Sequence, residues 1–314
     1  MQLVTGLMLF SVLFPAKTWF PPNQPLSITI KADAPAMLVL TEFTGKPIDP
    51  KAPIEVAPAQ QIDLRTLYPD LATPGTYVLY AVPKGKPITQ FTGTPLVIGS
   101  RADKRPGAPA GTMITKVEPL RYALMSTDQG DMVMAFYYDV APNTASAILT
   151  LAEQGFYDGL TFHRIIPGFV IQGGDPRADG TGGPGFQIDA EFNDRKHEEG
   201  VLSMARNGDP LEAQGAEPRG EFANSAGSQF FLCLGRVEHL DRRYTAFGKV
   251  VQGIDTLRKI AAVPIADKRT GRPEKPPVIT SVQVLPVTAD KNPYPAIMDN
   301  LKLARDLPST RPAQ

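Results

Sequence analysis

The sequence has few of the residues that disulfides, metal sites and charged surfaces require. Among its 314 residues there is one cysteine, Cys233, which lies in the apolar run FFLCL. A single thiol cannot close an internal disulfide, and its neighbours predict a small buried hydrophobe rather than a reactive nucleophile. Lys plus Arg equal Asp plus Glu at 32 each. This balance gives no electrostatic signature for nucleic acid or an anionic membrane, so neither is expected as a partner.

Signatures of several enzyme classes are also missing. The histidines are His163, His197 and His239, and they form no HExxH motif and no pair with a cysteine cluster. We therefore expect no metal site, and we interpret the charge run around His197, NDRKHEEG, as a solvated loop. No G-x-S-x-G motif supports a serine hydrolase. The run GTGGPG at 180–185 fits a dinucleotide pattern, but no strand precedes it and no helix follows. We interpret it as a tight loop and expect no cofactor.

Long apolar runs are absent except near the N-terminus. LVTGLMLFSVLF, at 3–14, has the length of a signal-peptide core and is too short to span a bilayer as a conventional helix. It lacks a preceding basic residue, and no clear A-x-A site follows. We expect residues 1–20 to be a signal or anchor segment and the protein to be periplasmic or membrane-associated. A misplaced start codon and a cytoplasmic location remain alternatives, and no other segment is expected to cross a membrane.

What the sequence has in abundance is proline and glycine, at 32 and 27 residues, within a chain long enough for about two domains. This composition predicts many short strands and turns. Five short β-rich runs separated by proline and glycine turns occupy 26–30, 36–43, 52–57, 76–82 and 94–99. We predict a small all-β, sandwich-like module over 24–100.

A basic segment rich in Pro, Gly and Ala follows, and we predict a linker at 101–116. A second domain is predicted over 117–288. It begins with a hairpin and continues with a helix, in which apolar residues recur at helical spacing from 145 to 152. Asn143 or Thr144 is expected to cap this helix, and Gly155 to end it.

Two further elements are expected in this domain. They are a short helix at 255–263 and a final strand at 278–287. The polar, proline-rich tail at 289–314 is predicted to be loosely held.

The run FHRIIPGFVIQGG, at 162–174, mixes residues that favour burial with His163, Arg164 and Gln172. Three more unusual runs follow in the same domain: GVLSMAR at 200–206, GSQFFLCL at 227–234 and EHLDRRYTAFGKV at 238–250. With GFYDGLTFHR and GTGGPG, these motifs resemble the cyclophilin family of peptidyl-prolyl cis/trans isomerases in the same order, over 122–287.

The resemblance implies a mainly β fold, with a closed, eight-stranded antiparallel barrel, two capping helices and a proline pocket on its outer face. It implies that Arg164 is catalytic. The residues that it implies for substrate binding are His163, Phe169, Val170, Gln172, Ala205, Arg206, Gln229, Phe231, His239, Leu240 and Tyr244.

The chain departs from the family pattern at four of these positions. Val170 stands where many members have methionine, Arg206 where the best-known eukaryotic members have asparagine, and Tyr244 where a histidine is frequent. His239 replaces a tryptophan important for cyclosporin-type inhibitors, so weak inhibitor sensitivity is our hypothesis. The interval from Ala205 to Gln229 is longer than usual, and we expect its inserted run, DPLEAQGAEPRGEFANSA, to alter substrate access.

The expected chemistry is rotation about X-Pro peptide bonds of protein substrates, which assists folding. The planar amide resists rotation with a barrier of about 18–20 kcal/mol, and a twisted amide frees a nitrogen lone pair that can accept a hydrogen bond. Arg164, always charged and with a planar fork of donors, suits that role. Two alternatives stay open. The domain could bind proline-containing peptides or act as a chaperone with little turnover, or the N-terminal module could be the functional part. The oligomeric state is expected to be a monomer.

Overall fold

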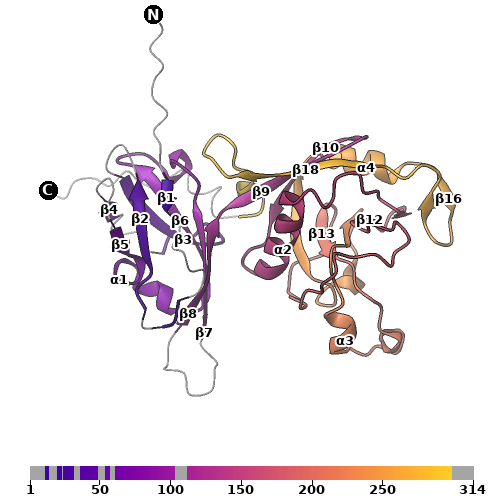
Figure 1. The fold of residues 1–314 in the computed structure, drawn as a ribbon, viewed down its shortest axis with the longest axis horizontal. Coiled ribbons are helices and arrows are strands. Elements are labelled where there is room, and N and C mark those ends of the chain that lie inside the picture. Colours follow the sequence, from indigo (N-terminus) through magenta and orange to yellow (C-terminus); the bar gives the residue numbers. More distant parts are fainter. Residues whose placement is uncertain are drawn as a thin grey trace, which may run out of the picture. The chain divides into compact units, whose positions relative to one another are not determined.

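The protein is described here from a computed structural model. Its described residues are 11–13, 20–22, 24–31, 36–48, 54–56, 61–102 and 112–298. They fall into two compact units, which are unit 1 (Met1–Leu120 with Pro286–Gln314) and unit 2 (Arg121–Leu285) (Figure 1). Most of the predicted signal or anchor segment lies outside the described residues. Among the helices that the structure describes, none is long and apolar enough to cross a membrane.

Unit 1 contains two antiparallel sheets. One has the order β1-β2-β5 and the other β4-β3-β6-β7-β8. The strands are β1 (Ser11–Leu13), β2 (Ser27–Lys31), β3 (Ala36–Glu42), β4 (Ile54–Val56), β5 (Gln61–Asp63), β6 (Gly75–Pro83), β7 (Leu96–Ala102) and β8 (Thr112–Pro119). A short helix, α1 (Leu64–Leu67), follows β5. Ile28, Leu38 and Leu79 come from different strands of both sheets and belong to one buried cluster, so a single core joins the two sheets.

Two expectations for the ends of unit 1 are corrected. Residues 112–116, predicted as part of a linker, form the first part of β8, which pairs with β7 through the register Ala102↔Thr112 to Leu96↔Pro119. The beginning of the tail is not loosely held. Tyr294 is fully buried and packs edge-on against Phe43, with 6.0 Å between the ring centroids. The aromatic and apolar residues of this polar segment therefore bury themselves in unit 1.

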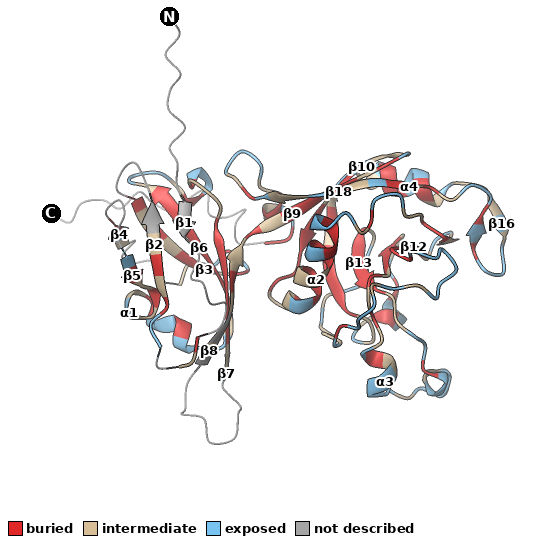
Figure 2. Cartoon of the chain, viewed as in Figure 1, coloured by how far each residue is buried: buried red, intermediate tan, exposed pale blue. Residues whose placement is uncertain are grey.

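Unit 2 is built around one antiparallel sheet of eight strands in the order β11-β12-β14-β13-β15-β10-β9-β18. Its strands are β9 (Arg121–Thr127), β10 (Gly130–Phe136), β11 (Arg164–Ile166), β12 (Val170–Gly173), β13 (Val201–Met204), β14 (Phe230–Cys233), β15 (Ala246–Gln252) and β18 (Ile279–Pro286). A separate hairpin joins β16 (Ile265–Asp267) to β17 (Arg272–Pro273). Figure 2 shows β13 buried along its length, at the centre of the sheet.

The helices of unit 2 are α2 (Pro142–Glu153), α3 (Gly220–Ala223) and α4 (Ile254–Ala261). The two predicted helices correspond to α2 and α4, while the single turn of α3 was not expected. The predicted capping of α2 by Asn143 or Thr144 is wrong. The carboxylate of Glu191 accepts the backbone N–H groups of Asn143 and Thr144 at 3.1 and 2.8 Å. An acidic side chain at a helix N-terminus is favourable because the unpaired N–H groups there carry partial positive charge.

Unit 2 is mainly β, as predicted, but its eight-stranded sheet does not form the predicted closed barrel. Its edge strands, β11 and β18, share no ladder. A single bridge, Thr161↔Val278, and neighbouring backbone hydrogen bonds link the residues just before these strands. Pro276 and Pro277 precede the bridge and have no N–H to donate, so a longer ladder cannot form there.

Candidate active site

The sheet register places the polar residues of the 162–174 run on one face. Arg164 of β11 is directly opposite Gln172 of β12, and Gln172 is opposite Phe231 of β14. Residues paired in this way project to the same side of an antiparallel sheet, and their neighbours in sequence project to the other side. Ile165 and Ile171 accordingly lie in the core, with no exposed surface. The mixed character of the run is the pattern of a strand pair with one buried face and one face that carries polar groups.

A chain of three hydrogen bonds crosses this face. The Arg164 Nη1 donates to Gln172 Oε1 at 3.1 Å, and Gln172 Nε2 donates to Gln229 Oε1 at 3.0 Å. Gln229 Nε2 in turn donates to the Gly182 carbonyl at 2.8 Å. Each amide orients the next, so the arginine is held at one end of a fixed row. Most of the guanidinium's donors make no hydrogen bond within the described residues, which leaves them free for a bound group.

An apolar cluster lies beside this row. We define the apolar cluster as Val170, Phe231, Cys233, Val237 and Leu240, with the partly buried Phe169, Ala205 and Tyr244 packed against it. The Tyr244 ring meets Phe231 edge to face, at 5.7 Å between centroids and 74° between planes. The guanidinium of Arg164 is partly buried beside these apolar side chains, and this loss of solvation lowers its pKa from the ordinary value.

The two phenylalanines of β14 point to opposite faces. Phe230 packs edge-on against Tyr157 and Phe162 in the core, with centroid distances of 5.7 and 6.4 Å. Phe231 instead belongs to the apolar cluster, next to Cys233. Cys233 has no exposed surface, and burial raises the pKa of its thiol to about 12. The prediction that Cys233 is a small buried residue is therefore confirmed.

A cavity of about 720 Å³ adjoins the row on its other side. Its lining includes four of the residues predicted to bind substrate, which are Gln172, Ala205, Arg206 and Gln229. Residues 180–187 complete the lining, and the glycine-rich run at 180–185 is a loop. Phe186 in this loop is 48% exposed, which is unusual for an aromatic residue in this structure.

The remaining predicted residues lie at the edges of this arrangement. His239 is exposed and stacks on Phe169, with ring centroids 5.6 Å apart and planes at 19°. His163 is buried, and neither ring nitrogen makes a hydrogen bond of good geometry within the described residues. Burial is also the main reason why the pKa of His163 is lowered. The structure therefore brings eleven of the twelve predicted residues to one region of the outer face or its cavity, and sets His163 behind it.

Three residues behind the apolar cluster were missed by sequence reasoning. The run around His197 is a loop with exposed charged residues, as predicted, but His197 itself is not solvated, because its side chain has no exposed surface and stacks on Phe231 at 6.2 Å. Its Nδ1 lies 3.1 Å from Asp241 Oδ1 and its Nε2 lies 3.0 Å from Ser203 Oγ. Asp241 is 44 positions away in sequence. No sequence pattern near His197 predicts Asp241 as its partner.

Metal ligands are not grouped in the part of the chain that the structure describes. No cluster of three or more His, Cys, Asp or Glu side chains there could hold an ion. The chemistry available at this site is that of a fixed guanidinium and two amides beside an apolar surface. Such a site can bind a ring-like apolar group and donate hydrogen bonds to an adjoining amide.

Comparison with known proteins agrees with this class of site. Residues 122–284 match the profile of the cyclophilin type peptidyl-prolyl cis-trans isomerase/CLD family. A peptidyl-prolyl cis-trans isomerase from Synechococcus elongatus is 42% identical over 151 residues, which cover 46% of this chain and 94% of that protein. Peptidyl-prolyl cis-trans isomerase B from Bacillus subtilis is 41% identical over 136 residues, or 43% of this chain and 85% of that protein.

A solved structure is also similar. It is a cyclophilin type peptidyl-prolyl cis-trans isomerase from Cryptosporidium parvum, with a TM-score of 0.47 and 29% identity, covering 54% of this chain and 99% of that chain. The resemblance seen in the sequence is thus confirmed by the family profile and the sequence relatives. The chain belongs to the family of cyclophilin-type peptidyl-prolyl cis-trans isomerases.

Proposed function

We propose that unit 2 catalyses rotation about X-Pro peptide bonds of polypeptide substrates by donating a hydrogen bond from Arg164 to the prolyl nitrogen. The observation that supports this most directly is the Arg164–Gln172–Gln229 row beside the apolar cluster. The proline ring would rest on Phe231, and the polar row would hold the amide that precedes it. Folding of client proteins is the process that such an activity serves.

The proposed mechanism depends on stabilising the twisted amide more than the planar one. In the planar amide the nitrogen lone pair is delocalised and accepts poorly, whereas in the twisted amide it can accept a proton donor. A charge-assisted hydrogen bond contributes about 1.5–3 kcal/mol, which corresponds to a rate effect of about ten- to a hundredfold. The apolar surroundings supply a second contribution, because they disfavour the more dipolar planar form.

The test is an isomerisation assay on a short X-Pro peptide by NMR exchange. Arg164→Ala is expected to lower kcat/KM by about ten- to a hundredfold. Arg164→Lys keeps the charge but loses the planar fork, so it is expected to recover only part of the rate. Arg258→Ala is the matched control, because this arginine is exposed and pairs with Glu199 away from the site. Equal rates for Arg164→Ala and the natural chain, with peptide binding retained, would favour the alternative of a binding or chaperone module.

We also propose that the protein is exported and monomeric. The apolar run at 3–14 supports export, and mass spectrometry of the mature N-terminus tests it, since an intact Met1 on protein recovered from the cytoplasm would contradict it. Among the described residues, Phe186 and Leu211 are the exposed large hydrophobic side chains, which gives no extended apolar patch for self-association. Light scattering on the purified chain measures the oligomeric state.

A further inference from the structure

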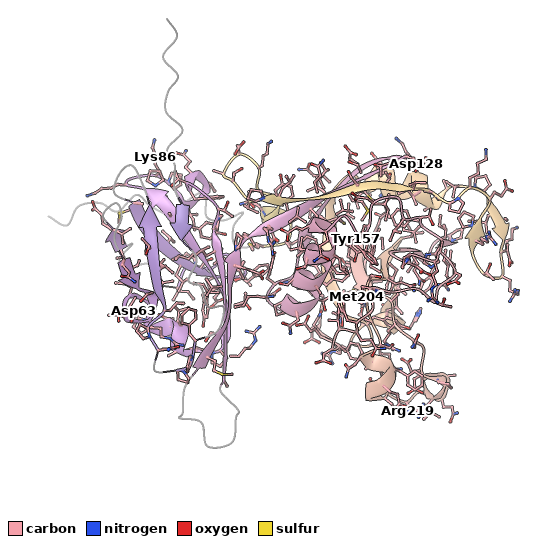
Figure 3. The ribbon with its side chains drawn as sticks, in the orientation of Figure 1. Asp63, Lys86, Asp128, Tyr157, Met204 and Arg219 are labelled. Atoms are coloured by element: carbon pink, nitrogen blue, oxygen red, sulfur yellow. The ribbon has the colours of Figure 1, made fainter. Side chains whose placement is uncertain are left out.

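The inserted run in the interval from Ala205 to Gln229 folds around a buried carboxylate, that of Asp209. We call residues 209–226 the insertion. It contains a 3-10 helix (Pro210–Gln214) and α3, and Figure 3 shows Arg219 next to α3. The buried Asp209 side chain accepts hydrogen bonds from Leu211 N at 3.0 Å and from Arg219 N and Nε at 3.0 and 2.8 Å. Hydrogen bonds from Arg219 hold the pKa of Asp209 well below its ordinary value. The insertion is therefore held together by hydrogen bonds between its own residues.

A second carboxylate of the insertion faces the site. Glu212 is the third residue of the 3-10 helix, and Asp209 N donates to its Oε2 at 3.1 Å, which completes a capping box. The same carboxylate makes a two-pronged ion pair with Arg206, at 2.7 Å from Nη2 to Oε1 and 3.0 Å from Nη1 to Oε2. The Arg206 side chain is only 2% exposed. A buried guanidinium needs a neutralising partner, and Glu212 supplies it.

The donors of Arg206 are all used inside the protein. Besides the two bonds to Glu212, Nε and Nη2 donate to the Arg243 carbonyl at 3.2 and 3.1 Å, and Nη1 donates to the Asn207 carbonyl at 2.8 Å. A guanidinium has five N–H groups, and these five hydrogen bonds account for them. The Arg206 side chain therefore has no donor left for a substrate carbonyl, although Arg206 is one of the residues that line the cavity.

What the Arg206 side chain does contact is an aromatic ring of the site. Its Cζ lies 4.3 Å from the centroid of the Tyr244 ring, and the Tyr244 ring packs edge-on against Phe231. A cation over an aromatic face is attracted to it, and a planar guanidinium can also stack on it. The contacts thus run without a break from Glu212 through Arg206 and Tyr244 to Phe231.

We propose that Glu212 is a positioning residue of the isomerase. Its carboxylate holds the Arg206 guanidinium against the Tyr244 ring, and this contact fixes the position of that ring beside Phe231 in the apolar cluster. This inference rests on the proposed function of the apolar cluster as the proline site. It gives the insertion a different role from the expected one of altering substrate access. In this view the insertion supports, through Arg206, the ring that the proline would contact.

The experiment compares two glutamates of the insertion in the full chain. Glu212→Gln removes the charge that holds Arg206 but retains the capping-box pattern, in which glutamine can replace glutamate. We expect the dissociation constant of an X-Pro peptide, from NMR titration, to rise about three- to tenfold, with kcat changed less than twofold. Glu212→Asp, which keeps the charge, should recover part of the affinity. Glu221→Gln is the control, because Glu221 is exposed and pairs at 3.4 Å with Arg219, which is not among the hydrogen-bond partners of Arg206.

A double-mutant cycle separates positioning from general stability. In a Tyr244→Leu background, Glu212→Gln should weaken peptide binding no further, because the ring that Arg206 holds is gone. If Glu212→Gln does not fold, the pair replacement Arg206→Met with Glu212→Met removes both charges together, which is often tolerated. This double variant should fold and still bind the peptide about three- to tenfold more weakly.

The results distinguish this inference from the proposed function. A normal dissociation constant in Glu212→Gln, or in the folded double methionine variant, would overturn the role of Glu212 while Arg164→Ala still lowered the rate. An Arg164→Ala variant with the natural rate would instead overturn the proposed mechanism, whatever Glu212 does. An equal effect of Glu212→Gln in both Tyr244 backgrounds would show that the carboxylate acts by another route.

Discussion

A methyl group added at Gly271 should disturb the arginine of the site without entering the site. Gly271 lies in the turn between β16 and β17, with φ of +79°, and its carbonyl accepts the Ile165 N–H at 2.7 Å. A Cβ built on it would lie 2.8 Å from the Ile165 carbonyl oxygen and 3.3 Å from Arg164 Cγ. Because the first contact is with backbone, β11 and the hairpin must move apart. The stem of Arg164 moves with β11.

The size of this effect has two parts that can be measured separately. A non-glycine residue in the left-handed region costs about 1–2 kcal/mol of stability. The displacement of Arg164 adds a loss of rate, because misplacing a catalytic group by about 1 Å can cost about a hundredfold. We therefore expect Gly271→Ala to lower kcat of the X-Pro peptide assay by about ten- to a hundredfold, with a smaller change in peptide affinity.

Gly159→Ala is the matched control for Gly271→Ala. Gly159 has nearly the same φ, +81°, but a Cβ there would meet no atom within 4 Å. In a denaturant titration, Gly159→Ala should lose only the free energy of unfolding that the left-handed conformation costs, Gly271→Ala should lose more because of its backbone contact, and only Gly271→Ala should lose activity. Equal kcat values for the two variants would refute the reasoning that β17 fixes the position of Arg164.

Three further predictions concern stability. Tyr294→Ala should destabilise unit 1 by about 3–5 kcal/mol, as for other buried aromatic residues, and leave isomerisation unchanged; a calorimetric scan in which the transition of unit 1 does not move would contradict this. Glu191→Gln should cost about 1 kcal/mol in unit 2, because it weakens the cap of α2, and high salt should reduce the difference from the natural chain. Burial lowers the pKa of His163 below its ordinary value of 6.5, so the unfolded chain binds this proton more readily than the folded one. The stabilising contribution of His163 is therefore complete above pH 6.5 and falls as the pH drops below it. Because burial also lowers the pKa of His197, His163→Gln should reduce, but not abolish, the slope of the unfolding free energy between pH 7 and 5, and an unchanged slope would exclude a contribution from His163.

Most of the site residues were predicted from the resemblance of their motifs to the cyclophilin family, and strand alternation explains why they share a face. Alternation along a strand assigns Arg164 and Gln172 to one face and Ile165 and Ile171 to the other, and a two-strand register then brings Arg164 opposite Gln172. The same reasoning separates Phe230 from its neighbour in β14. The amphipathic spacing of α2 was equally local, so its position was predicted while its cap was not.

What could not be predicted depends on partners far apart in the chain. His197 has charged neighbours and looks solvated, yet it is buried because Asp241, 44 residues away, meets its backbone and ring. The cap of α2 comes from Glu191, which follows Asn143 by 48 residues. The burial of Tyr294 likewise requires Phe43, and no pattern in a polar, proline-rich tail indicates such a distant ring.

The strands that present the site also form the core, which limits how the site can change. Phe231 and Phe230 are consecutive residues of β14, so a backbone shift that widens the apolar cluster displaces the ring packed on Tyr157 and Phe162. Cores tolerate little change of volume or position. Tyr244 and Arg206 lie outside these strands, on segments fixed by side-chain hydrogen bonds, and there the chain can vary without repacking the core. This gives a physical reason why the insertion contacts Tyr244 through Arg206 and does not contact Phe231 directly.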